Sequence, residues 1–288
     1  MRFEKYFVPQ TRQECFALLK QYGDKAKVLA GGTDVIQLLK SGALKPEAII
    51  DIRKVEGLGE TKVTDKGLAL GAMVRLRELS LNKPLAADYP VIMEAAGHVS
   101  SMQIRNIATI GGNACNASPS ADAIQGLILM SATAVVESAE GNREIPISQF
   151  FTGPGTTSLK KGELLVGFTV PKPPARTGAF YEKFAIRGDT DITIVGAGAS
   201  VTLAADGTVS GAVVSLAAVA PTPLRMSAVE GMLVGKKLTP ELIDAAAQTA
   251  SNNVTPISDQ RASAEYRVEM VCVWTKSALT KALERANA

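Results

Sequence analysis

Two adjacent glycines, placed between an apolar run and a helical pattern, constrain this chain most. Residues 27–29 are typical of a short strand, and the apolar positions of residues 35–40 recur at helical spacing. Between them, Gly31 and Gly32 permit backbone conformations closed to other residues and a close approach by a ligand. A helix that begins just beyond offers free N–H groups suited to a phosphate. This stretch alone is compatible with a phosphate cradle or with a tight turn that binds nothing.

A second diglycine, Gly111-Gly112, repeats the pattern further along the chain. Apolar residues precede it, and Ser118 with Pro119 then has the form of a helix start, since serine caps well and proline suits the first helical position. Two diglycine turns, each followed by a capped helix, could hold the two phosphates of a dinucleotide from opposite sides. The repetition therefore favours the cradle.

Side chains around the two diglycines extend the interpretation. Asp34, with Gln37 three residues later, predicts a capped start for the first helix. Most of the binding would come from backbone N–H groups. Hydroxyl donors of Thr33 and Thr109 and the amide of Asn113 could add to it.

Composition and charge exclude several classes of function. The 288 residues are 46% hydrophobic and 20% charged, which is typical of a globular protein with enough material for two domains. The net charge is +3 without a dense basic run, so binding to nucleic acid has no electrostatic support. The most apolar stretch, residues 123–136, is too short and interrupted to span a bilayer. We expect a cytoplasmic protein with no membrane insertion.

The cysteines and the single histidine predict no metal site and no catalytic residue. Cys15, Cys115 and Cys272 lie far apart and have no metal-ligand spacing. An iron–sulfur cluster needs four cysteine ligands, so this chain cannot hold one by the usual ligation. We expect Cys115 to be a small buried residue and His98 to be structural.

The order of strand and helix patterns predicts two domains. Residues 1–56 have the pattern strand–helix–strand–helix–strand, with Thr11 as the expected cap of the first helix and Glu14 three residues later. Residues 57–174 have the pattern of two hairpins with helices and an irregular segment at 150–157. The proline-rich residues 171–174 make a stiff connector. Residues 175–288 predict a three-stranded antiparallel sheet with helices on one face. Gly196 and Gly198 lie in a strand pattern without a third glycine, which excludes a Rossmann fingerprint.

The motifs together resemble the FAD-binding medium subunit of the molybdenum hydroxylases, the xanthine dehydrogenase and carbon monoxide dehydrogenase family. The matching segments are residues 30–34, 109–113, 117–119, 122, 163–165, 171, the strand that contains Lys183, 187–192 and 258–267, so the resemblance runs almost end to end. It implies an α+β fold. A two-part FAD-binding domain of the PCMH and vanillyl-alcohol-oxidase type, residues 1–174, would precede a smaller domain of the carbon monoxide dehydrogenase flavoprotein type, residues 175–288.

The resemblance also implies the residues that bind FAD. Asp122 would accept a hydrogen bond from a ribose or adenine donor, although an acidic residue in a first helical turn is also favoured by the helix dipole. Leu165 and Ile192 would border the flavin, and Lys183 would stabilise its reduced form. For these three, core packing or a surface charge is the alternative. The expected set is Leu29, Ala30, Gly31, Gly32, Thr33, Asp34, Val35, Ile36, Ala108, Thr109, Ile110, Gly111, Gly112, Asn113, Ser118, Asp122, Leu165, Lys183 and Ile192.

The function implied by the resemblance is electron transfer. A large partner subunit would hold the molybdenum cofactor, and a small one would pass electrons from its [2Fe-2S] clusters through FAD here to an external acceptor, in a hetero-oligomer such as a dimer of heterotrimers. NAD, a quinone, ferredoxin and oxygen all fit as that acceptor. Two alternatives stay open: a self-contained reductase of the UDP-N-acetylenolpyruvoylglucosamine reductase type, and a non-catalytic FAD-binding protein.

A last group of polar residues, Asp259, Arg261, Tyr266 and Arg267, predicts a structural network that holds the final helix.

Overall fold

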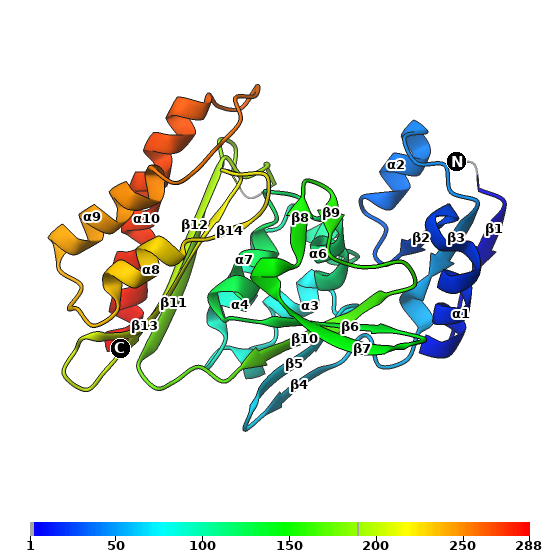
Figure 1. The fold of residues 1–288 in the computed structure, drawn as a ribbon, viewed down its shortest axis with the longest axis horizontal. Coiled ribbons are helices and arrows are strands. Elements are labelled where there is room, and N and C mark those ends of the chain that lie inside the picture. The colour runs from blue at the N-terminus through cyan, green and yellow to red at the C-terminus, as the bar shows by residue number, and fades with distance from the viewer. Residues whose placement is uncertain (1–2, 189) are drawn as a thin grey trace.

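Three units follow one another across the molecule in the computed structural model, which describes residues 3–188 and 190–288 (Figure 1). Asp189, within one of the matching segments, lies outside the described residues. The N-terminal unit lies at one end, a five-stranded sheet with helices occupies the centre, and a second sheet with three helices lies at the other end. No helix in the described residues is long and apolar enough to cross a membrane.

The N-terminal unit has the predicted alternation of strands and helices. Its strands are parallel in the order β1-β3-β2, so the first helix crosses from one edge strand to the other and the second joins the neighbouring strands β2 and β3. Thr11 caps the first helix as predicted, because its side chain accepts from the Glu14 N–H at 3.2 Å. The elements are β1 (Lys5–Phe7), α1 (Arg12–Tyr22), β2 (Ala26–Leu29), α2 (Val35–Ser41) and β3 (Ala48–Asp51).

The central unit is an antiparallel sheet in the order β4-β5-β10-β6-β7, with helices α3, α4, α6 and α7 above it (Figure 1). Both predicted hairpins are present, as β4 with β5 and β6 with β7. Residues 150–157, predicted to be irregular, instead contain a short hairpin. The elements are β4 (Thr61–Thr64), β5 (Gly67–Gly71), α3 (Leu76–Ser80), α4 (Pro90–Gly97), α5 (Met102–Arg105), α6 (Ile110–Asn116), α7 (Asp122–Leu129), β6 (Thr133–Ser138), β7 (Gly141–Pro146), β8 (Phe151–Gly153), β9 (Thr156–Thr157) and β10 (Leu164–Pro171).

The C-terminal unit is an antiparallel sheet in the order β11-β12-β13-β14. The three long strands were predicted, and the fourth, β14, adds only two residues at the edge. Helices α8 and α10 pack on one face, while α4 and α7 of the central unit contact the sheet as well, so it joins two units. The elements are β11 (Thr177–Phe184), β12 (Val195–Leu203), β13 (Val209–Ala217), β14 (Leu224–Arg225), α8 (Ser227–Leu233), α9 (Pro240–Ser251) and α10 (Ala264–Asn287).

Two glycines of β12 explain how α7 and β11 approach this strand so closely. A Cβ at Gly196 would lie 2.4 Å from the Tyr181 hydroxyl oxygen, and one at Gly198 would lie 2.6 Å from a methyl carbon of Leu129. Both distances are far shorter than a van der Waals contact. The glycine pair that mimics a dinucleotide motif in the sequence is therefore a packing requirement.

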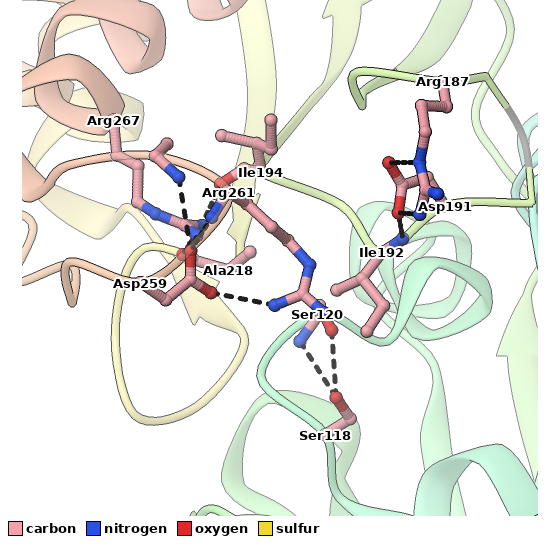
Figure 2. Close-up of polar contacts among 11 residues, drawn as sticks. Ser118, Ser120, Arg187, Asp191, Ile192, Ile194, Ala218, Asp259, Arg261 and Arg267 are labelled. Atoms are coloured by element: carbon pink, nitrogen blue, oxygen red, sulfur yellow. Dashed lines mark hydrogen bonds and ion pairs between the residues drawn. The ribbon is translucent and has the colours of Figure 1, made fainter.

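Asp259 anchors the start of α10. Figure 2 shows its carboxylate between the guanidinium groups of Arg261 and Arg267, at 2.9 Å from each. Arg267 also donates to the Ile194 carbonyl at 2.6 Å, which ties α10 to the start of β12. The predicted network is confirmed for these three charged residues, whereas the Tyr266 ring contacts Phe184 instead.

The pKa of Asp259 predicts acid sensitivity of the C-terminal unit. Desolvation alone would raise this pKa. Hydrogen bonds from Arg261, Ala262 and Arg267 have the larger effect and lower the pKa to about 2. A carboxylate with a lowered folded-state pKa stabilises the fold above its unfolded pKa, and this stability is lost as the pH falls through the folded value. We expect stability to decline between about pH 4 and pH 2.

Thermal unfolding of D259N tests this expectation. The variant should unfold at a lower temperature than the wild type at pH 7, and should lose less additional stability on acidification. D244N is the control, because Asp244 pairs with Lys276 on the exposed surface of α9. If the unfolding temperature of D259N fell with pH as much as that of the wild type, Asp259 would not be the source of the acid sensitivity.

Candidate functional site

The two diglycine segments lie against each other. A Cβ on Gly31 would stand 2.2 Å from the Ile107 carbonyl oxygen and 3.0 Å from the Ala108 Cα, so the two backbones touch at this point. The Asn116 amide also donates to a carboxylate oxygen of Asp34 at 3.4 Å. Gly32 has a φ of +81°, a conformation that favours glycine. The two segments therefore face one shared cleft.

The local structure of the second diglycine differs from the prediction. Gly111 and Gly112 lie inside the first turn of α6, and Thr109 caps that helix by accepting from the Gly112 N–H at 3.0 Å. The helix predicted to begin after Ser118 begins only at Asp122. Ser118 is not its cap, because residues 118–121 close a separate turn in which the Ser118 carbonyl accepts from the Ala121 N–H.

The first helix start also departs from its expected capping. Asp34 precedes α2 but makes no capping hydrogen bond, since its backbone is already helical and its side chain is turned to Thr33 and Asn116. This carboxylate therefore links the two glycine segments. It does not close the predicted reciprocal pair with Gln37.

The cleft has a volume of about 1310 Å³ and collects residues from all three units. Most of the expected binding residues line it. They are Ala30, Gly31, Gly32, Thr33, Asp34, Val35, Ala108, Thr109, Gly111, Gly112, Asn113, Ser118, Asp122, Leu165, Lys183 and Ile192.

Three expected residues do not line the cleft. Leu29 and Ile36 pack in a small apolar cluster under the first glycine segment, and Ile110 is fully buried in the central core. Each adjoins a lining residue in the chain, so they support the segments and do not face a ligand. Cys115, expected to be buried, is exposed and lines the cleft.

A buried polar cluster forms the wall of the cleft where the central and C-terminal units meet. One oxygen of Asp122 accepts from the Tyr181 hydroxyl at 2.7 Å and from the Thr193 hydroxyl at 2.6 Å. Its other oxygen lies 3.0 Å from the Lys183 ammonium, which also donates to the His98 carbonyl at 2.9 Å. The side chains of Lys183 and Asp122 are 3% and 7% exposed, so this ion pair is shielded from solvent.

Tyr181 and Thr193 were not predicted as site residues. Burial, and then the neighbouring Asp122 charge, raise the pKa of Tyr181 well above its ordinary value, so the phenol stays a neutral donor. A strand pattern at residues 179–185 was the only signal for Tyr181. Its partner is 59 positions away in sequence, which local spacing does not reveal.

A group of lysines lines the cleft on the side of the N-terminal unit, and the sequence analysis did not predict it. Lys25 and Lys161 form ion pairs with Glu47 and Asp24. Lys27, Lys45 and Lys160 make no ion pair with any residue that the structure describes. This end of the cleft suits an anionic ligand.

The cleft also holds a buried acceptor without a partner. Asn113 lines it, and among the described residues nothing donates to its Oδ1 atom. A buried polar atom normally has a hydrogen-bond partner, so a ligand donor is a suitable one. Residues 3–188 and 190–288 include no cluster of three or more His, Cys, Asp or Glu side chains that could hold a metal ion.

Known protein families and relatives match this chain along nearly its whole length. Residues 1–173 match the family model described as the FAD binding domain in molybdopterin dehydrogenase, and residues 179–282 match the carbon monoxide dehydrogenase flavoprotein C-terminal domain. The carbon monoxide dehydrogenase medium chain of Hydrogenophaga pseudoflava is 34% identical, with 99% of this chain and 98% of that one covered.

One further relative, with another substrate in its name, and one solved structure agree with this match. Subunit alpha of the 6-hydroxypseudooxynicotine dehydrogenase complex of Paenarthrobacter nicotinovorans is 32% identical, over 98% of this chain and 95% of that one. A solved structure of carbon monoxide dehydrogenase from Hydrogenophaga pseudoflava superposes with a TM-score of 0.95 at 35% identity, over 99% of this chain and 98% of that chain.

The contact at Gly31 gives a stability prediction. In G31A the new methyl group would overlap the Ile107 carbonyl, so the two segments must separate. We expect the free energy of unfolding to fall by about 1–3 kcal/mol, the usual cost of overpacking. Urea unfolding measures the change. G59A is the control, because a Cβ there meets nothing within 4 Å, and equal stability of the two variants would contradict the contact.

Proposed function

The chain belongs to the family of FAD-binding subunits of the molybdenum hydroxylases, and from this we propose how it takes part in their electron transfer. It is the flavoprotein subunit of a multi-subunit molybdenum-dependent dehydrogenase. We propose that electrons arrive from the [2Fe-2S] clusters of a small partner subunit and leave to an external acceptor. The observation that carries this proposal is the pair of glycine segments packed together on one cleft.

The residues of the cleft fit FAD. Without side chains at Gly31 and Gly32, the backbone N–H groups of the first segment can approach a pyrophosphate closely. Gly111 and Gly112 keep the second segment slim, while their own N–H groups donate to the Ala72 carbonyl and the Thr109 hydroxyl. The unpaired lysines favour the negative charge of the phosphates, and the unpartnered Asn113 oxygen can accept from a ligand donor. When bound, FAD supplies the electron-carrying chemistry itself.

We propose that the protein positions and shields this cofactor and contributes no acid–base group. Lys183 and Ile192 line the cleft from the C-terminal unit and Leu165 lines it from β10 of the central unit, and we assign all three to the flavin ring. Leu165 is buried and apolar, so it can exclude water, and Lys183 contributes a positive charge. Both oxygens of Asp122 already accept hydrogen bonds or face Lys183, so we assign this residue to the protein network and no longer to the ribose or adenine.

The partners follow from the same family membership. We propose a large subunit with the molybdenum cofactor, a small subunit with the [2Fe-2S] clusters, and an assembly such as a dimer of heterotrimers. None of the relatives reported above supports the self-contained reductase or a non-catalytic FAD carrier. The division at residue 174 and the cytoplasmic location stay predictions.

Asn113 provides a test of FAD binding. N113A removes a buried acceptor that has no partner in the described part of the chain, so the apo chain should not lose stability. If FAD donates to this atom, the affinity for FAD should fall about tenfold, the effect of one hydrogen bond. Quenching of flavin fluorescence on binding measures the affinity.

S158A is the matched control, because the buried Ser158 hydroxyl also has no partner among residues 3–188 and 190–288, and Ser158 does not line the cleft. Its affinity for FAD should equal that of the wild type. A wild-type chain that shows no flavin absorbance after addition of FAD would overturn the proposed function.

The proposed assembly makes a separate prediction. The complex purified through this chain should contain two further kinds of subunit, together with molybdenum and iron. Native mass spectrometry and metal analysis measure both. A complex with the expected mass but without iron would contradict the proposed route of electrons, while a chain that purifies alone would contradict the partners.

A further inference from the structure

Asp122 joins two parts of the molecule inside the wall of the cleft. It begins α7 in the central unit, whereas Tyr181, Lys183 and Thr193 belong to β11 and to the segment before β12. Tyr181 and Thr193 are both 1% exposed, so neither hydroxyl can exchange its partner for bulk water. This group connects the C-terminal sheet to the helix that carries the carboxylate.

The two oxygens of Asp122 have different partners. Two neutral hydroxyls donate to one oxygen, and the ammonium of Lys183 lies against the other. The hydroxyl donors fix the rotation of the carboxylate and draw part of its negative charge to the oxygen remote from Lys183. Lys183 itself lines the cleft, so the position of its charge is felt by a bound cofactor.

We propose that Tyr181 and Thr193 are positioning residues for Lys183, and that through Asp122 they raise the reduction potential of the bound FAD. This inference rests on the proposed function, because it requires FAD in the cleft with its ring near Lys183. Tyr181 does not line the cleft, and Thr193 lines it with a hydroxyl that already donates to Asp122, so neither hydroxyl needs to touch the cofactor. The two act by fixing the counter-charge of the ammonium.

The sign of the effect follows from the charges. A flavin gains electrons on reduction, so a nearby positive charge favours the reduced form and a negative charge opposes it. Loss of either hydroxyl leaves a less neutralised and less fixed carboxylate beside the cofactor. The midpoint potential should therefore move to a more negative value.

The structure supplies matched controls for both residues. Tyr89 is as buried as Tyr181 and lies in the same core cluster, but no described residue partners its hydroxyl. Thr275 is as buried as Thr193, and its hydroxyl also has no partner in the described part of the chain. Y89F and T275V remove the same atoms as Y181F and T193V without touching Asp122.

Spectroelectrochemical titration of FAD in the purified complex tests the proposal. We expect more negative midpoint potentials for Y181F and T193V, a larger shift for the double variant, and wild-type potentials for Y89F and T275V. K183M removes the charge itself and should shift the potential in the same direction. T193S keeps a hydroxyl and should restore the wild-type value even where T193V folds poorly.

The outcomes separate this inference from the proposed function. Y181F and T193V that bind FAD at the wild-type potential, with or without a lower unfolding temperature, would overturn the positioning role and leave FAD binding intact. A positive shift would overturn it as well. A wild-type chain that holds no FAD would overturn the proposed function first.

Discussion

The contact between Gly31 and the backbone at Ile107 and Ala108 is the constraint on which the cleft depends. It brings together two segments that belong to different units. No side chain can occupy that position, because any Cβ would overlap a carbonyl oxygen. The same absence of side chains lets a ligand come close to the backbone of both segments. One requirement of packing thus also provides the surface on which a pyrophosphate can lie.

A second junction, at α7, holds the C-terminal sheet against the same cleft. Gly196 and Gly198 let β12 approach Tyr181 and Leu129, and Asp122 at the start of α7 then receives the hydroxyls of Tyr181 and Thr193. A buried carboxylate is costly unless it is paired and hydrogen-bonded. Here three donors from the neighbouring unit meet that cost. The arrangement of units and the charge of the cleft wall are therefore set by the same contacts.

The sequence was informative where a signal is local. The cap at Thr11, the hairpins and the alternation of strands and helices in the N-terminal unit follow from spacing, and the structure confirms them. The start predicted at Ser118 was wrong because Ala117, with a φ of 48°, ends α6 and leads into a separate turn that uses the same serine and proline. Which residues meet Asp122 depends on partners 59 and 71 positions away, which spacing does not report.

The family resemblance named Lys183 and Asp122 but assigned them separate roles. In the structure they form one ion pair, and its orientation depends on two hydroxyls that no motif contains. In a protein whose chemistry belongs to its cofactor, the contribution of the chain is the placement of charge and the exclusion of water. Such placement requires partners that fix the charged groups themselves. A residue such as Tyr181, which does not line the cleft, can then act on the cofactor through the lining residue Asp122.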